Sequence, residues 1–307
     1  MKIMNEILIC IPTYNRNKSL INCLKSIRNL KNISFFKIKV LILDNSITNN
    51  SYKIIKKFNK KKFYKIYQDH EKKRGIVFAR NKCLQIARKL KPDYIAFIDD
   101  DCIVNNNWLK NIFKLFNKTD ADVITGPQLY EGQSKSNPMF LFEKNYKKKL
   151  LKVTWAASNN VFFKFDILKQ VKNIKFDKNL NKFGMGEDQL FFSIISKIGY
   201  KIYWSQNVVV TEKMHPHRSK INWIKERSKR LGILGHYLDI KIHGKVIGYL
   251  INYIKFLYLF FFSILIYVNI FNINRNLDFT NNMFRCYGKL IGPFKFKKIL
   301  FLQKKIY

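Results

Sequence analysis

The sequence Ile-Ala-Phe-Ile-Asp-Asp-Asp-Cys, residues 95–102, places three carboxylates directly after a short apolar run. The run begins at Tyr94, and its aromatic and β-branched residues are typical of a strand buried on both faces. In an open α/β sheet, ligands bind beyond the C-terminal ends of the strands. We therefore expect Asp99, Asp100 and Asp101 to lie at a binding site.

These three carboxylates repel one another unless a cation compensates their charge. A Mg²⁺ or Mn²⁺ ion takes one or two carboxylates together with substrate phosphates. Because residues i and i+2 of extended chain point the same way, Asp99 and Asp101 are the expected pair. The structural alternative is an acidic turn that caps the following helix. The scarcity of acids, 20 Asp and Glu against 58 Lys and Arg, favours ligand binding over capping.

The composition bounds the class of protein. A chain of 307 residues can bury a large core in one or two domains. The formal net charge of +38 is compatible with a nucleic acid or an anionic membrane as partner. Lys, Asn and Ile are abundant throughout, which indicates a general bias more than a local patch. Five scattered cysteines indicate a reduced cytosolic compartment, and the polar residues 1–6 predict no signal peptide.

Short apolar runs and helical patterns alternate along the first hundred residues. Turn-forming residues from Pro12 to Arg16 separate the first strand from the first helix, and Arg74-Gly75 precedes another helix. Four β–α repeats predict a parallel, Rossmann-like sheet. The expected strands cover residues 7–11, 38–43, 63–67, 93–98, 123–125, 161–165, 200–204 and 208–211, and the expected helices cover 20–30, 51–58, 76–90, 108–116 and 189–198.

A second acidic group follows two glycines in Phe183-Gly184-Met185-Gly186-Glu187-Asp188. The glycines allow unusual backbone angles, and the acids open a helix whose dipole suits negative charge. Capping of that helix is the structural interpretation. A flexible Gly-x-Gly turn can equally direct Glu187 and Asp188 into the crevice of the first acidic cluster.

The chain changes character after residue 220. A basic helix is expected over 221–239, and residues 246–271 are apolar apart from Lys255 and a few Asn. A spanning helix needs about 20 residues, so this stretch suffices if Lys255 snorkels. A single crossing would leave a strongly basic tail outside, against the positive-inside tendency. We therefore favour peripheral or monotopic attachment over a span, and a buried helix of a soluble domain comes third.

Several motifs occur together in one order and resemble glycosyltransferase family 2, whose members are inverting enzymes with the GT-A fold. The resemblance covers roughly residues 5–235. It implies a GT-A domain over 1–240, with a mixed, mostly parallel sheet flanked by helices. The composition predicts that residues 241–307 form a basic and hydrophobic membrane-associating region with a helical segment. The motifs are Pro12-Thr13-Tyr14-Asn15-Arg16, Asp44, Gly75 with Ala79-Arg80-Asn81, Asp99-Asp100-Asp101, Asn159-Asn160 and Gly184-x-Gly186-Glu187-Asp188.

A looser resemblance concerns the later part of the chain. His215 to Arg218, Asn222-Trp223 and Arg227-x-x-Arg230-x-Gly232 look like members that build bacterial exopolysaccharide and lipopolysaccharide repeat units on lipid carriers. The acceptor that this implies is a glycan or a polyprenyl-diphosphate-linked sugar.

The resemblance also implies roles for individual residues. Asp188 matches the general base, and Glu187 would orient the acceptor. Asp101 matches the metal-holding acid, with Asp99 supporting the metal or the ribose and either His215 or His217 as a third ligand of the metal. The ion, Mn²⁺ or Mg²⁺, would neutralise the leaving diphosphate. The residues that would bind the substrate are Pro12, Thr13, Tyr14, Arg16, Asp44, Arg80, Asp99, Asp100 and Asn159.

Some of these assignments have structural alternatives. Arg80 could be a surface cation in so basic a chain, and His215 and His217 could be ordinary surface residues. Asp44 at a strand end can accept from a base N–H group, which favours uracil or guanine and hence a UDP-sugar donor.

The sequence thus predicts an inverting glycosyltransferase of cell-surface polysaccharide synthesis on the cytoplasmic face of the inner or plasma membrane, with no nucleic-acid partner. One alternative is a metal-dependent sugar nucleotidyltransferase, which would carry a Gly-rich basic loop where Pro12 to Asn17 has no glycine. The other is a basic nucleic-acid-binding protein, whose affinity would fall steeply with salt.

Overall fold

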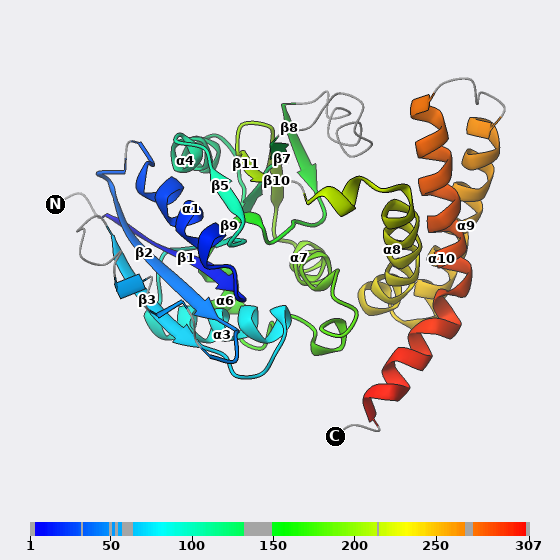
Figure 1. Ribbon diagram of the computed structural model, residues 1–307, viewed down its shortest axis with the longest axis horizontal. Coiled ribbons are helices and arrows are strands. Elements are labelled where there is room, and N and C mark those ends of the chain that lie inside the picture. The colour runs from blue at the N-terminus through cyan, green and yellow to red at the C-terminus, as the bar shows by residue number, and fades with distance from the viewer. Residues whose placement is uncertain are drawn as a thin grey trace. The chain divides into compact units, whose positions relative to one another are not determined.

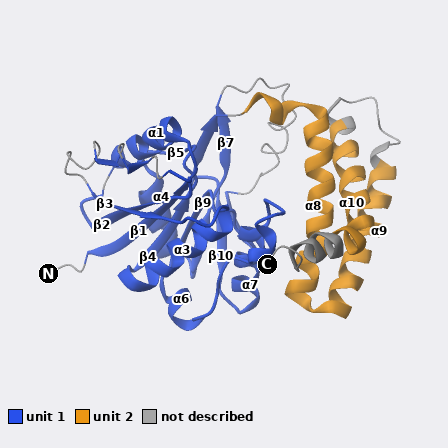
Figure 2. Cartoon of the chain, turned by 60° about the horizontal axis from the view of Figure 1, so that its bottom comes forward, with its two compact units in different colours: residues 1–131, 146–213 blue, residues 132–145, 214–307 orange. Residues whose placement is uncertain are grey.

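A computed structural model describes residues 4–31, 33–48, 51–52, 55–56, 64–131, 149–213, 215–267 and 273–304. The chain divides into two compact units, which are coloured separately in Figure 2. Unit 1 comprises residues 1–131 and 146–213 and contains every strand among the described residues. Unit 2 comprises residues 132–145 and 214–307, and its described part is helical.

Unit 1 is built on a mixed, mostly parallel sheet (Figure 1). Four parallel strands form one side of this sheet, in the order β3, β2, β1, β4, and the others continue as β9, β6, β10, β8. β9 is antiparallel to both of its neighbours, and β8 is antiparallel at the edge. The strands are β1 (Asn5–Thr13), β2 (Phe36–Asp44), β3 (Lys65–His70), β4 (Tyr94–Ile98), β6 (Val123–Thr125), β8 (Leu150–Val153), β9 (Asn160–Lys164) and β10 (Ile202–Ser205).

Side chains on the two faces of this sheet enter two separate hydrophobic clusters. In β1, Ile7, Ile9 and Ile11 pack with α1 and α4, whereas Leu8 and Cys10 pack with α3, α6 and α7. Because helices cover both faces, the central strands read as continuous apolar runs. The helices are α1 (Asn17–Arg28), α3 (Ile76–Leu90), α4 (Trp108–Lys118), α6 (Asp166–Gln170) and α7 (Glu187–Lys197), with a short 3₁₀ helix η1 (Lys178–Leu180).

A second, small sheet lies beside the C-terminal end of β4. Its strands are β5 (Cys102–Val104), β11 (Val210–Lys213) and β7 (Gln128–Glu131), with β11 in the middle. The register sets Glu212 opposite Cys102. The small sheet therefore brings a residue from the end of unit 1 next to the aspartate cluster.

The predicted α/β architecture is confirmed, and most element boundaries differ by one to three residues. The helix over 76–90 and the strand over 123–125 agree with the prediction. The turn expected at Pro12 begins later, because β1 continues to Thr13, which pairs with Asp44. Half of the expected helix over 51–58 lies outside the described residues.

Among its described residues, unit 2 contains three long helices after a short 3₁₀ helix, η2 (Pro216–Ser219). They are α8 (Ile221–His243), α9 (Lys245–Tyr267) and α10 (Ile273–Lys304). Glycines let α8 and α10 approach closely: a Cβ atom on Gly232 would lie 2.1 Å from the carbonyl oxygen of Arg285. On Gly288 it would lie 2.1 Å from the carbonyl oxygen of Lys229.

The predicted domain boundary near residue 240 falls within α8. This helix packs against α9 and α10, and the division between compact units lies at residues 213 and 214. The division between the compact units at residues 213 and 214 thus differs from the domain boundary expected near residue 240. The functional domain limits stay a prediction. The sequence pattern set no bounds for the long helix α10, because its basic and apolar residues are mixed and Pro293 lies within it.

α9 is the helix in the described part of the chain that is long and apolar enough to cross a membrane, and only 17% of the residues in its apolar 18-residue stretch, within 245–265, are buried. The Nζ atom of Lys255 lies 2.5 Å from Oδ1 of Asp239 on α8. The lysine that interrupts the apolar stretch is thus compensated within unit 2. Residues 268–271, the end of the stretch expected to contact the membrane, lie outside the described residues.

Candidate active site

A pocket of about 330 Å³ lies at the C-terminal ends of β1 and β4 and the N-terminus of α3, all within unit 1. Many of the residues expected to bind substrate line it. The lining also includes four residues that the sequence had not assigned to substrate binding, namely Asn45, Arg74, Gly75 and Ile76. The predicted residues in the lining are Pro12, Thr13, Tyr14, Arg16, Arg80, Asp99 and Asp100.

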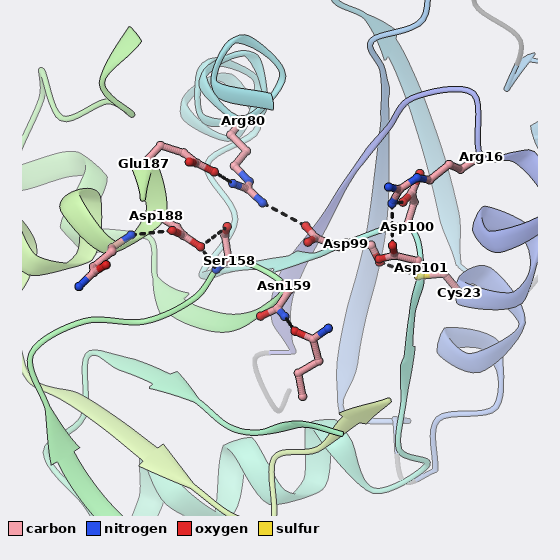
Figure 3. A network of polar contacts seen from close by, with 12 residues as sticks. Arg16, Cys23, Arg80, Asp99, Asp100, Asp101, Ser158, Asn159, Glu187 and Asp188 are labelled. Atoms are coloured by element: carbon pink, nitrogen blue, oxygen red, sulfur yellow. Dashed lines mark hydrogen bonds and ion pairs between the residues drawn. The ribbon is translucent and has the colours of Figure 1, made fainter. Parts of the chain in front are cut away.

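Hydrogen bonds to Asp100 connect the end of β1 and the loop after it to the end of β4. The Thr13 hydroxyl donates to Oδ2 of Asp100 at 2.6 Å, and Nη1 of Arg16 donates to Oδ1 at 3.2 Å. The same Arg16 nitrogen donates to Oδ2 of Asp101 at 2.6 Å (Figure 3). Burial raises the pKa of Asp100 to about 6, although Thr13 and Arg16 act in the opposite direction. Arg16 therefore compensates part of the negative charge of this cluster.

Arg80 is 4% exposed, so the surface-cation alternative is wrong. Its Nη1 atom donates to Oε1 of Glu187, and its Nη2 atom donates to Oδ1 of Asp99 at 3.1 Å. Figure 3 shows the guanidinium group between the two carboxylates. Burial, together with repulsion from Asp188, raises the pKa of Glu187, and Arg80 opposes that shift. Within the described residues, Nε of Arg80 and Oε2 of Glu187 are buried without a hydrogen-bond partner.

Asp188 is held in a fixed orientation at the start of α7. Its Oδ2 atom accepts from the backbone N–H and the hydroxyl of Ser158, at 3.1 and 3.2 Å. Its Oδ1 atom accepts from the backbone N–H of Gln189 at 2.7 Å. Gly186, with φ of 87°, supplies the left-handed backbone that turns the chain into the helix. Asp188 is half-buried, so a substrate group can still reach its carboxylate.

Two predicted residues have other local contacts. Oδ1 and Oδ2 of Asp44 accept from the backbone N–H groups of Ser46 and Ser51, at 2.8 and 2.9 Å, and these bonds lower its pKa despite burial. Asp44 is not part of the pocket lining, whereas its neighbour Asn45 is. The amide of Asn159 donates to the side chain of Gln128 on β7.

A candidate cation site lies between β5 and β11. Ligand atoms of Asp101, Cys102 and Glu212 lie within 4.8 Å of one another. Burial and the nearby carboxylates raise the pKa of Cys102 well above its ordinary value, so its thiol stays neutral. The two carboxylates are the oxygen ligands that Mg²⁺ and Mn²⁺ prefer, and they fit a divalent cation.

This pair differs from the predicted ligand set of Asp99, Asp101 and His215. Asp99 pairs with Arg80 instead. His215 belongs to unit 2, where its Nδ1 atom lies 3.2 Å from Nδ1 of His217. Glu212 carries no motif in the sequence, and only the pairing of β11 with β5 reveals its position.

Comparison with known proteins identifies relatives of this chain. Residues 8–172 match the family described as Glycosyl transferase family 2. Over 196 residues the chain is 26% identical to poly(ribitol-phosphate) beta-N-acetylglucosaminyltransferase TarP of Staphylococcus aureus (strain N315), covering 61% of this chain and 56% of TarP. Over 244 residues it is 25% identical to the succinoglycan biosynthesis protein ExoM of Rhizobium meliloti (strain 1021), covering 77% of this chain and 76% of ExoM. The chain thus spans about half the length of TarP.

Two solved structures share the fold. S. aureus TarS 1–349 in complex with UDP has a TM-score of 0.53 at 18% identity, covering 77% of this chain and 69% of the TarS chain. The mannosyltransferase PcManGT from Pyrobaculum calidifontis, in complex with GDP-Man and Mn²⁺, has a TM-score of 0.61 at 13% identity, covering 94% of this chain and 87% of that chain. These likenesses confirm the predicted GT-A fold.

Proposed function

Because this chain belongs to glycosyl transferase family 2, we propose that it transfers a sugar from a nucleotide-diphosphate sugar to an acceptor hydroxyl, with inversion at the anomeric carbon. The observation that carries this proposal is the link made by Arg80. It joins Asp99 of the pocket to Glu187, the neighbour of Asp188. A donor pocket and a candidate base are thereby held in one polar network.

The nucleotide of the donor would bind in the 330 Å³ pocket. Tyr14 offers an aromatic face there, with the guanidinium carbon of Arg74 5.2 Å from the ring centroid. Arg16 and Arg80 supply positive charge for the diphosphate. We propose a UDP-sugar donor, which is supported by TarS, whose structures are described with UDP and UDP-GlcNAc.

Asp101 and Glu212 would hold a divalent cation, Mn²⁺ or Mg²⁺, in this proposal. Such an ion stabilises the negative charge of a leaving diphosphate. Arg16, which pairs with Asp101, adds a second positive charge at the same carboxylate. PcManGT, whose structure is described with Mn²⁺, supports the choice of ion.

Asp188 would act as the general base. As the acceptor oxygen forms its bond to the anomeric carbon, the bond from that carbon to the diphosphate oxygen breaks, and the acceptor proton passes to the carboxylate. Ser158 and the N–H group of Gln189 hold Asp188 in place. Since the base and the leaving group lie on opposite faces of the sugar, the configuration inverts. Glu187, fixed by Arg80, would orient the acceptor.

We further propose that α9 attaches the protein to the cytoplasmic leaflet of the inner or plasma membrane without crossing it. Its exposed side chains are mainly aromatic and aliphatic, Lys241 precedes it, and Lys245 is its first residue. Each basic residue near an anionic leaflet contributes roughly 1 kcal/mol of attraction. Attachment of this kind suits a glycan or polyprenyl-diphosphate-linked acceptor in cell-surface polysaccharide synthesis, and ExoM, a succinoglycan biosynthesis protein, supports it.

A screen of UDP- and GDP-sugars with Mn²⁺ or Mg²⁺ tests this function. We expect one donor to raise the thermal unfolding midpoint and to be hydrolysed slowly without an acceptor, and EDTA should abolish the hydrolysis. Failure of every donor to bind or react would contradict the proposal. Formation of a nucleotide sugar from a nucleoside triphosphate and a sugar phosphate would instead establish the nucleotidyltransferase alternative.

A further inference from the structure

α8 and α10 enclose a second pocket, of about 240 Å³, entirely within unit 2. Its polar lining consists of Trp223, Arg227 and Ser228 from α8 and Asn281 and Arg285 from α10, and two aliphatic side chains complete it. Pockets for whole drug-sized ligands usually measure about 300–1,000 Å³. The size of this pocket therefore suits a small headgroup.

The lining of this α8–α10 pocket selects for an anion. It contains two guanidinium groups and no carboxylate. The nearest acid along α8, Glu226, has an Oε1 atom 3.1 Å from Nζ of Lys229, and its side chain is 63% exposed. One arginine guanidinium group can donate two parallel hydrogen bonds to the oxygens of one phosphate group. The lining therefore offers donors for more than one phosphate group.

The aromatic and amide side chains make the pocket rigid. The guanidinium carbon of Arg227 lies 5.2 Å from the ring centroid of Trp223, and the Ser228 hydroxyl donates to Oδ1 of Asn281 across the two helices. Among the ion pairs of the described residues, none includes Arg285. The guanidinium group of Arg285 is thus available to a ligand.

This pocket lies at the same end of the bundle as the most apolar part of α9. Asn252 contacts Lys289, and the Sγ atom of Cys286 lies 3.8 Å from the carbonyl oxygen of Phe256, so α9 runs antiparallel to α10. Later residues of α9 therefore lie beside earlier residues of α10, where the pocket is. That part of α9 exposes large apolar side chains, namely Tyr258 at 65%, Phe261 at 60%, Phe262 at 42% and Leu265 at 68%.

We propose that the α8–α10 pocket binds the diphosphate of an isoprenoid lipid, with the hydrocarbon chain lying against the C-terminal half of α9. The two arginines match two phosphates, and the apolar surface at the same end of the bundle takes the chain. The inference deepens the proposed function, on which it rests, by assigning a site for the lipid carrier of the acceptor. No chemical step occurs at this site.

Lipid binding by the full-length protein in phosphatidylcholine nanodiscs tests the inference. An isoprenoid diphosphate is titrated in the absence of any nucleotide sugar, so that the result is independent of transfer. Two other compounds are titrated in parallel: phosphatidylglycerol, an anionic lipid without a diphosphate, and inorganic diphosphate, which has no hydrocarbon chain. The variants are Arg227→Gln, Arg285→Gln and the double variant, and Arg230→Gln is the charge-matched control on the same helix that does not line the pocket.

We expect the double variant to bind the isoprenoid diphosphate at least tenfold more weakly, while Arg230→Gln changes affinity less than twofold. An equal loss in the control would overturn the inference in favour of general charge attraction. Tighter binding of phosphatidylglycerol than of the diphosphate lipid would also overturn it, in favour of bulk anionic lipid. If the wild type hydrolyses a nucleotide sugar but binds no isoprenoid diphosphate, this inference fails and the proposed function stands. Unchanged thermal midpoints establish that the variants fold.

Discussion

Arg80 on α3 forms a buried ion pair with Glu187, the first residue of α7, 107 positions further along the chain. A second nitrogen of the same guanidinium group reaches Asp99 at the end of β4. An arginine without these carboxylates could not remain buried, because the loss of hydration would be uncompensated. The pair therefore fixes the start of α7, and with it Asp188, relative to the donor pocket.

The first prediction concerns this pair. Arg80→Gln should lower the free energy of unfolding by about 3 kcal/mol, because it leaves Glu187 buried without a cation. Since burial already raises the pKa of Glu187 to about 7, protonation limits the loss near neutral pH. The double variant with Glu187→Gln should recover much of the stability, as measured by chemical denaturation.

Lys82→Gln is the control for the comparison of the single and double variants. The Nζ atom of Lys82, on the surface of α3, lies 3.6 Å from Oδ2 of Asp69. This substitution should change the free energy of unfolding by less than about 1 kcal/mol. Strictly additive effects of Arg80→Gln and Glu187→Gln would show that the two side chains are not coupled.

The second prediction concerns the base. Asp188→Asn keeps the shape of the side chain but removes the proton acceptor, so kcat should fall by roughly 10²–10⁴-fold. The dissociation constant of the donor should change less than about twofold, because the base matters mainly in the transition state. Steady-state kinetics and donor titration measure the two effects. Asp166→Asn, at an exposed carboxylate paired with Lys169, is the control and should leave kcat unchanged.

The third prediction separates the two proposed sets of metal ligands. Glu212→Gln should weaken Mn²⁺ binding at least tenfold, because it removes one of two carboxylates whose ligand atoms lie within 4.8 Å of each other. His215→Gln should change the affinity less than twofold. Electron paramagnetic resonance of Mn²⁺ titrated into each variant measures this without any turnover. A larger effect of His215→Gln would restore the ligand set that the sequence suggests.

The sequence was sufficient wherever local pattern determines structure. The apolar run from Tyr94 to Ile98 and the periodicity of residues 76–90 specify a buried strand and an amphipathic helix without any distant contact. Glu212 could not be predicted in the same way, because its position depends on the register between two strands of three and four residues. The burial of Arg80 likewise depends on a partner 107 residues away.

The fourth prediction concerns membrane attachment. Replacing Phe261 and Leu265 by aspartate should release the protein from vesicles that contain anionic lipid, because both side chains are exposed on the apolar face of α9. Ile198→Asp, at a residue of unit 1 that is 52% exposed, is the control and should leave binding unchanged. Vesicle sedimentation measures the effect.

A reporter fused after Tyr307 distinguishes the two modes of attachment. It should remain cytoplasmic if α9 lies at the membrane surface, and a periplasmic reporter would establish a single span. Recovery of the wild-type protein in the soluble fraction without any wash would mean that α9 is packed against protein instead.

The fifth prediction uses a buried lysine of unit 2. Burial lowers the pKa of Lys289 from 10.5 to about 8, although Asp239 opposes the shift. Between these two values the unfolded chain binds more protons than the folded chain, so stability should rise as the pH increases from about 8 to 10.5. Relative to Lys289→Gln, the wild type should gain on the order of 2 kcal/mol over this interval.

Chemical denaturation at a series of pH values measures that gain. Lys245→Gln, at an exposed lysine, should follow the wild type. Parallel pH profiles for the wild type and Lys289→Gln would contradict the assignment of the shift to burial of this one amine.

The anomeric configuration of the sugar in the first product formed tests the central claim most directly. Proton NMR of the glycoside formed by wild-type turnover reports this configuration relative to the donor, because the anomeric carbon of a glycoside does not mutarotate. With Asp188 as the base and no covalent intermediate, the account predicts inversion. A product that retains the configuration of the donor would contradict it.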